Sequence, residues 1–245
     1  TASNTGAHAE GYGSSSTNKN TASGQGSHAE GRITLASNVA SHAEGYGTKS
    51  TNIGSHSEGK VTTASGISSH AEGTYTVASS EGSHAQGYMT NATGFASFSG
   101  GSYTYATGIN SVALGYVSYA TYNNAVAIGH FVYTYSPYSA TFGAYTYTYG
   151  HVDFAIGTAN KASGNNSFVG GAYSVTSNHS SIAFGHQALA SGYISAAIGG
   201  KVSATNTYSS AFGNNTTSSG IASHSEGKNT TASGHYSHVE GNDNT

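Results

Sequence analysis

The chain has 245 residues, with 35 glycines, one proline and no cysteine, and its formal net charge is −3. The missing cysteines exclude a disulfide framework and a thiolate metal site, and the seven scattered lysines and arginines exclude the basic footprint of a nucleic-acid-binding protein. No stretch approaches the roughly 20 apolar residues that cross a bilayer, so we expect no membrane contact within this segment.

A repeat runs along almost the whole chain and closes each time with a glycine. From Gly31 to Gly241 this glycine recurs every 14 residues, whereas the copy that closes at Gly11 stands 20 residues before Gly31. Six extra residues therefore interrupt the first coil, and we place them at "YGSSST", residues 12–17. A fixed period over this length is typical of a solenoid. We predict a single repeat domain over residues 1–245, with the first coil end and its insertion over 1–17 and strict repeats over 18–241.

Each coil is numbered here so that its closing glycine is position 14. Glycine is also frequent at position 7, which gives two turn signals seven residues apart, each preceded by alternating residues. Seven residues hold a short strand but not a helix with its connections. Each strand would pair in parallel with its counterpart in the next coil, about 4.8 Å away. The predicted fold class is all-β, a flattened parallel β-roll of 14-residue coils with two strands per coil.

Small residues define the predicted inside of this roll. In the coil that ends at Gly73, positions 3, 5 and 12 are Thr62, Ala64 and Ala71. Two sheets joined by tight turns lie close together, so only small side chains fit between them. Because side chains alternate across a strand, positions 11 and 13 must point out of the roll if Ala71 points in.

Histidine and glutamate occupy positions 11 and 13 in the N-terminal coils and again in the last two. The motif "SHAEG" and its variants occur seven times, and an eighth copy has Gln86 in place of the glutamate. An active site is normally made once, so the repetition argues against catalysis. The residues of this His–Glu column are His8, Glu10, His28, Glu30, His42, Glu44, His56, Glu58, His70, Glu72, His84, Gln86, His224, Glu226, His238 and Glu240.

We predict that the column is a structural ladder in which imidazoles donate to carboxylates, between chains or between coils, because buried charges need partners. No catalytic residue, cofactor or metal is assigned. A metal or anion site built by imidazoles remains the alternative. Protonation of the histidines is expected to loosen the N-terminal third of the chain below roughly pH 5.

Tyrosines crowd the first half of the coils between residues 103 and 150, as in "YTYATG" and "YTYTYG". They fall at positions 2 or 4, opposite in parity to the inward residues, so we predict an exposed aromatic ladder. Two roles are open: stacking that stiffens the sheet by fractions of a kcal/mol per pair, and a contact surface for a glycan, a protein or a neighbouring fibre. The candidate binding residues are Tyr103, Tyr105, Tyr119, Tyr133, Tyr145 and Tyr147.

In the coils between residues 110 and 185, the outward positions 11 and 13 are large and apolar. A row of such side chains cannot remain in water over this length and implies a partner surface. The simplest partner is another copy of the same chain, packed around an axis parallel to the roll. The residue pairs are Val112/Leu114, Val126/Ile128, Phe154/Ile156 and Ile182/Phe184.

The segments "NSVALG" (110–115) and "NNAVAIG" (123–129), with "ATGINS" (106–111) and "ASGNNS" (162–167), resemble the YadA-like head repeat of trimeric autotransporter adhesins. The resemblance covers essentially the whole chain at its 14-residue period. It implies a left-handed parallel β-roll, a parallel homotrimer and a non-enzymatic, extracellular head on a cell surface. Such a head attaches to host matrix, cells or neighbouring fibres, and the His–Glu column would then line the trimer axis.

Other interpretations stay open beside this one. "SHAEG" repeats also resemble those of phage tail fibres and appendages, which would place the chain on a virion tail. Ice or mineral binding by regular threonine rows is weaker, because Thr62, Thr76 and Thr90 are assigned inward. The chain begins at Thr1 without a signal peptide, so we expect any export signal or anchor to lie outside it.

Overall fold

The computed structural model describes residues 1–13 and 19–245, which are treated below as two compact units, Thr1–Asn124 and Ala125–Thr245. The described residues form β-strands and turns and contain no helix, which confirms the all-β prediction. The predicted insertion, residues 12–17, falls mainly outside the described residues. On either side of it, β1 (His8–Gly11) pairs with β3 (His28–Arg32) so that His8 lies opposite His28. This pairing confirms the longer first step of the repeat.

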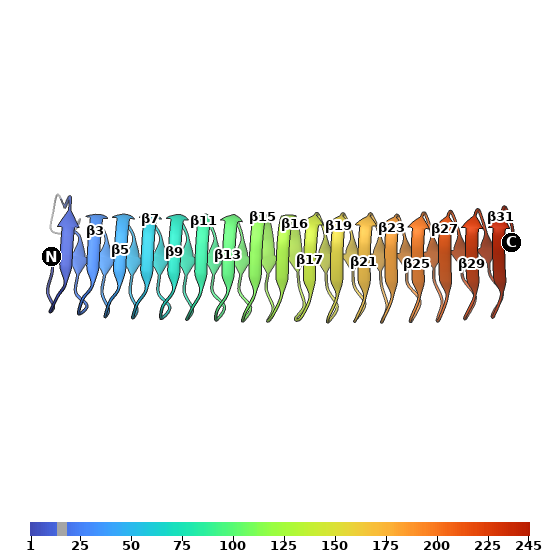
Figure 1. Cartoon of the computed structure of the whole chain (residues 1–245), viewed down its shortest axis with the longest axis horizontal. Helices are drawn as coiled ribbons and strands as arrows, with labels where there is room; N and C mark the ends of the chain where they lie inside the picture. Colours follow the sequence, from blue (N-terminus) through green and yellow to red (C-terminus); the bar gives the residue numbers. More distant parts are fainter. Residues whose placement is uncertain (14–18) are drawn as a thin grey trace. The chain divides into compact units, whose positions relative to one another are not determined.

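Each complete coil of the first unit contributes one long and one short strand, and the long strands lie parallel, side by side (Figure 1). In β15 (Val112–Ala120) the two strands run together. The other long strands are β5 (His42–Tyr46), β7 (His56–Lys60), β9 (His70–Thr74), β11 (His84–Tyr88) and β13 (Phe98–Ser102). The short strands are β2 (Thr21–Ala22), β4 (Leu35–Ala36), β6 (Lys49–Ser50), β8 (Thr63–Ala64), β10 (Val77–Ala78), β12 (Asn91–Ala92) and β14 (Tyr105–Ala106).

The second unit repeats this plan, and β16 (Val126–Thr134) again joins a long and a short strand. Its other long strands are β17 (Ala140–Ala144), β19 (Phe154–Thr158), β21 (Phe168–Ala172), β23 (Ile182–His186), β25 (Ala196–Gly200), β27 (Ser210–Asn214), β29 (His224–Lys228) and β31 (His238–Asn242). Its short strands are β18 (Tyr147–Thr148), β20 (Lys161–Ala162), β22 (Val175–Thr176), β24 (Leu189–Ala190), β26 (Ser203–Ala204), β28 (Thr217–Ser218) and β30 (Thr231–Ala232).

Every strand pairs in parallel with its equivalent one coil away, so equivalent residues stack on one another. His70 in β9, for example, is the register partner of His56 in β7 and of His84 in β11. The predicted 14-residue parallel β-solenoid is therefore confirmed within each unit. Because the 14-residue repeat coincides with the register of the parallel pairing, equivalent residues form continuous columns along a unit.

The inside of the roll is filled by small side chains, as predicted. Thr62, Ala64 and Ala71 are fully buried. The position-10 serine closes the turn, because Ser69 Oγ donates to the Gly66 carbonyl at 2.8 Å and accepts from the Gly66 N–H at 3.1 Å. The burial of the threonine row excludes it as an ice- or mineral-binding surface.

The two recurring glycines serve different purposes. Gly73, at position 14, has φ of +107°, and a Cβ there would lie 2.2 Å from the Gly87 carbonyl oxygen. Gly66, at position 7, is not in the left-handed region, but a Cβ would lie 1.9 Å from the Ser80 carbonyl oxygen. Glycine is therefore favoured at Gly66 by the close approach of the next coil, although Ser80 occupies the same position one coil further on, and glycine is required at position 14 by both the close approach and the backbone angle.

Candidate functional surfaces

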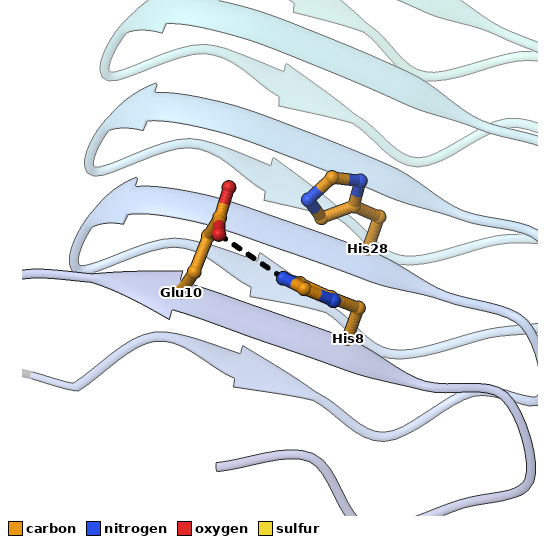
Figure 2. A group of neighbouring side chains, drawn as sticks. All are labelled: His8, Glu10 and His28. Carbon is orange, nitrogen blue, oxygen red and sulfur yellow. Dashed lines mark ion pairs between the residues drawn. The ribbon is translucent and has the colours of Figure 1, made fainter.

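The long strands of the first unit present the His–Glu column. β3, β5, β7, β9 and β11 each start at a histidine whose neighbour at position 12 is buried, so the imidazoles and carboxylates point outward as predicted. In the coils that carry both residues, the paired carboxylate lies two residues further along the same coil. The coil of β11 has Gln86 there, and the carboxylate grouped with His84 is Glu72 of the preceding coil. His8 Nε2 lies 3.2 Å from Glu10 Oε2, and Figure 2 shows this pair beside His28 of the next long strand.

Deeper in the column the imidazole–carboxylate distances are longer. The Nε2–Oε2 separation is 3.8 Å for His28 and Glu30, and 4.0 Å for His42 and Glu44. These are ion-pair distances and not hydrogen bonds. The imidazoles also contact one another between coils, where the rings stack: His42 and His56 have centroids 4.7 Å apart and planes 4° apart.

Burial and stacking act together on protonation. Partial burial is the largest effect that lowers the pKa of His56, followed by repulsion from His42 and His70, and the nearby Glu58 and Glu44 oppose it. Burial and His70 likewise lower the pKa of His84. In both residues the fold favours the neutral imidazole.

The C-terminal copy of the motif is engaged differently. His224 Nδ1 lies 2.8 Å from Ser210 Oγ, and its Nε2 lies 3.3 Å from Glu226 Oε2. Both ring nitrogens of His224 therefore have partners. His238 and Glu240, at the end of the unit, are largely exposed and 3.6 Å apart.

In the second unit the same face is apolar. Ile156 is 41% exposed, Ile182 42% and Phe184 47%, and all three stand on long strands beside fully buried alanines. The outward direction predicted for these positions is therefore confirmed. The face presents large apolar side chains in successive coils, with Gly170 between Ile156 and Phe184 in the position-13 column.

Four of the six candidate tyrosines lie at position 4, in the short strands β14 and β18 or in the short-strand parts of β15 and β16, and stack in pairs. Tyr105 and Tyr119 in the first unit have ring centroids 4.8 Å apart and planes 11° apart, and Tyr133 and Tyr147 in the second unit stack at 5.3 Å. All four are half-buried. Burial, and then the neighbouring Tyr147, raise the pKa of Tyr133.

The other two candidates, Tyr103 and Tyr145, do not belong to that row. Both sit in turns with φ of +56° and +53°, which the parity rule for extended strands does not describe. Tyr103 packs edge-to-face between Tyr88 and Tyr116, with centroids 5.5 and 6.1 Å away. The single predicted ladder is therefore wrong in this detail, because position 2 lies in the turn at the edge of the roll and only position 4 lies in the short strand.

Tyr135 and Tyr149, at position 6, complete the aromatic surface of the second unit and were missed by the sequence reasoning. They stack on each other at 5.4 Å, and Lys161 Nζ lies 5.2 Å from the centre of the Tyr149 ring. The available signal was the i, i+2 spacing in "YTYTYG", which places a second tyrosine beside each position-4 ring.

A parallel β-solenoid of 14-residue coils, with outward His–Glu pairs in the first unit and outward apolar side chains in the second, defines a β-solenoid repeat protein. The family model described as the YadA head domain repeat (2 copies) matches residues 58–79, 106–131, 154–174 and 177–201. With the solenoid fold, these matches support a YadA-like head domain in the chain, a kind of segment known from trimeric autotransporter adhesins. A search of curated proteins found no match.

Within the described residues, no helix is long and apolar enough to cross a membrane.

Proposed function

We propose that the chain is the head segment of a homotrimeric, non-enzymatic adhesin, with three parallel copies packed through their long-strand faces. The observation that carries this proposal is the exposed apolar row of the second unit, which includes Ile156, Ile182 and Phe184. Contiguous apolar patches of this kind mark interaction sites. Parallel copies of one chain around a threefold axis would bury every coil of the row in the same way.

Sedimentation equilibrium of the full chain tests the assembly. The expected mass is three times the 24.6 kDa of one chain. The double variant Ile156→Ser/Phe184→Ser should dissociate the trimer, whereas Ile67→Ser should not, because Ile67 is equally exposed but lies in a turn away from this face. A stable, folded monomer of the unaltered chain would contradict the proposal.

Attachment is the proposed role of the assembled head, at a cell surface outside the cell. The stacked tyrosines support it, because aromatic side chains are enriched where proteins meet partners. The partners considered are a host matrix protein, a glycan and a neighbouring fibre. In the first unit the row is Tyr105 and Tyr119; in the second it is Tyr133, Tyr135, Tyr147 and Tyr149.

Binding to matrix-coated surfaces, glycan arrays and cells tests this role. The variant Tyr105→Ser/Tyr119→Ser/Tyr133→Ser should lose attachment and remain trimeric. A matched control replaces three more exposed tyrosines outside the row: Tyr173→Ser, Tyr208→Ser and Tyr236→Ser. Equal attachment by both variants would remove the stacked row from consideration.

The second candidate function is that of a segment of a phage tail fibre or appendage protein. It is supported by the resemblance of the "SHAEG" coils to fibre repeats; the coils of residues 1–57 and 202–245 lie outside the segments matched by the family model, whereas the copy at 69–73 lies inside one. The reading frame around the chain separates the two: a neck, stalk and membrane anchor would support the adhesin, and neighbouring phage structural modules the tail fibre.

A further inference from the structure

Five imidazole nitrogens in the His–Glu column are buried and have no hydrogen-bond partner. They are the Nε2 atoms of His28, His42, His56, His70 and His84. Buried polar atoms in proteins nearly always have a partner, so a whole column without one needs an explanation. An imidazole nitrogen in this condition is a ready metal ligand.

Glutamate oxygens stand beside these nitrogens in a repeating arrangement of two imidazoles to one carboxylate. Three groups share no residue, and within each of them the three ligand atoms all lie within 4.8 Å of one another. Figure 2 shows the first group. The three groups are His8–Glu10–His28, His42–Glu44–His56 and His70–Glu72–His84.

We infer that the His–Glu column of the first unit binds divalent ions of borderline softness, Zn²⁺ foremost, with one ion in each of these three groups. Two imidazoles and a carboxylate form a ligand set that Zn²⁺ takes at about 2.0–2.2 Å, with a fourth position left for water. The inference concerns ligands within a single chain and does not depend on the proposed trimer.

The distances suit a site that closes on its ion. Tetrahedral ligands at zinc bond lengths lie about 3.4 Å apart, so the longest separations, of up to 4.8 Å, must shorten by about 1.4 Å. Rotation of the outward side chains supplies this movement while the paired strands stay in register. The backbone therefore sets the spacing of the sites, and the side chains close the coordination.

Along the column, a metal ion should lie between every second pair of neighbouring histidines. A fourth group, His28–Glu30–His42, takes one histidine from each of the first two groups, so it cannot be filled together with them. The three independent groups place their ions two coils apart, about 9–10 Å. This spacing reduces the repulsion between doubly charged ions and predicts three ions per chain.

The ligand set also discriminates between ions. Mg²⁺ and Ca²⁺ prefer sites made of oxygen atoms, and each group here offers only one carboxylate. Zn²⁺, Ni²⁺ and Cu²⁺ accept imidazole readily. His224 and His238 in the second unit belong to no such group, and both nitrogens of His224 are already engaged.

Isothermal titration calorimetry of the untagged full chain with Zn²⁺ at pH 7.5 tests the inference. We expect three ions per chain for the unaltered protein, two for His42→Gln/His56→Gln, and three for the control His224→Gln/His238→Gln. The variant Glu44→Gln keeps all imidazoles and should weaken one of the three sites at least tenfold. This variant should keep the fold, because a glutamine, Gln86, occupies the equivalent position in another coil. Mg²⁺ should give no binding heat.

One ion or fewer per chain would overturn the inference, as would equal stoichiometry for the unaltered chain and His42→Gln/His56→Gln. A loss of sites in the control variant would overturn it too. Far-UV circular dichroism of each variant establishes that the solenoid is intact. A monomeric chain that binds three ions would support the metal sites while contradicting the trimer, so the two proposals fail separately.

Discussion

The imidazole rings of His42 and His56 lie face to face, with centroids 4.7 Å apart and planes 4° apart. The register of β5 and β7 fixes this arrangement, because the two residues are direct partners in the parallel pairing. His28 and His42 stack in the same way at 4.7 Å. A positive charge on one ring is therefore held close to a charge on the next. The two charges repel each other, so each added proton costs more free energy than the one before.

This geometry predicts acid sensitivity of the first unit. His56 and His84 have pKa values below the ordinary 6.5, chiefly because of burial. A histidine whose pKa is lower in the folded state binds its proton more weakly there than in the unfolded chain. The stability it contributes is fully present above pH 6.5 and is lost as the pH falls through the folded-state pKa. Hydrogen exchange in the presence of EDTA should show protection of residues 20–90 falling between pH 7.5 and pH 4.5.

The second unit and one variant serve as controls for this effect. Residues 154–200 carry apolar side chains at the equivalent outward positions and should keep their protection over the same range. His56→Gln/His84→Gln should reduce the pH dependence of the first unit. Equal protection of both regions at pH 4.5 would show that repulsion between the protonated imidazoles does not destabilise the first unit.

A second prediction concerns the close approach of coils at position 14. Gly73→Ala would place its Cβ 2.2 Å from the Gly87 carbonyl oxygen, on a backbone with φ of +107°. Both the clash and the backbone angle oppose the substitution, so we expect a loss of more than about 3 kcal/mol in the free energy of unfolding, measured by urea denaturation.

Gly54→Ala is the matched control for that substitution. Gly54 also has positive φ, of 60°, but its Cβ would meet only the Ser68 Oγ at an ordinary 3.5 Å. Ala40 already adopts φ of 52° at the equivalent position. The control should cost about 1 kcal/mol. Similar losses for Gly54→Ala and Gly73→Ala would show that the backbone angle alone, and not coil contact, demands glycine.

The fold could be predicted from the sequence because the repeat shows which positions of a coil must be small and which are outward. Equivalent residues recur at a fixed spacing, so a small residue at Ala71 or Thr62 is seen many times over, and chance variation at one coil is averaged out. The outward direction of His70 followed directly from the burial of Ala71 and the alternation of a strand.

What the sequence left undetermined depends on rotamers and turn geometry. The pairing of His42 with Glu44 in the same coil, and its stacking on His56, follows from side-chain torsions that spacing does not specify. Tyr103 was grouped with Tyr105 because two residues separate them, but the left-handed backbone at Tyr103 breaks the alternation on which that grouping rested. Parity arguments hold within a strand and fail across a turn.

A third prediction tests how tightly the inside of the roll is packed. Ala71 is fully buried among alanines of its own and neighbouring coils. Ala71→Leu adds three carbons where only small side chains fit, and overpacking of this kind costs about 1–3 kcal/mol. Urea denaturation measures the loss. The control is Thr63→Leu, at an outward position where Leu35 stands natively in another coil, and it should change stability by less than about 0.5 kcal/mol.

The last prediction concerns Asp153, a buried carboxylate at position 10, where its neighbours in the column are Ser139 and Ser167. It is 1% exposed and accepts hydrogen bonds from the Gly150 N–H and from the Ser167 N–H and hydroxyl at 2.8–2.9 Å. Burial outweighs these bonds and raises the pKa of Asp153 above the ordinary 3.8. A carboxyl with a raised pKa binds its proton more tightly in the folded state, so its ionisation lowers stability.

The free energy of unfolding should therefore contain a penalty from Asp153 that grows as the pH rises from 3.8 through the folded-state pKa. Asp153→Ser restores the usual residue of the column and should gain in stability relative to the unaltered chain as the pH rises from 3.5 to 7, measured by urea denaturation at both values. Asp243→Ser, at an exposed aspartate, separates this effect from a general change in charge. A different result would be a free energy of unfolding of Asp153→Ser that falls, relative to the unaltered chain, as the pH rises from 3.5 to 7. The hydrogen bonds from Gly150 and Ser167 would then outweigh burial, and the ionised carboxylate would stabilise the turn.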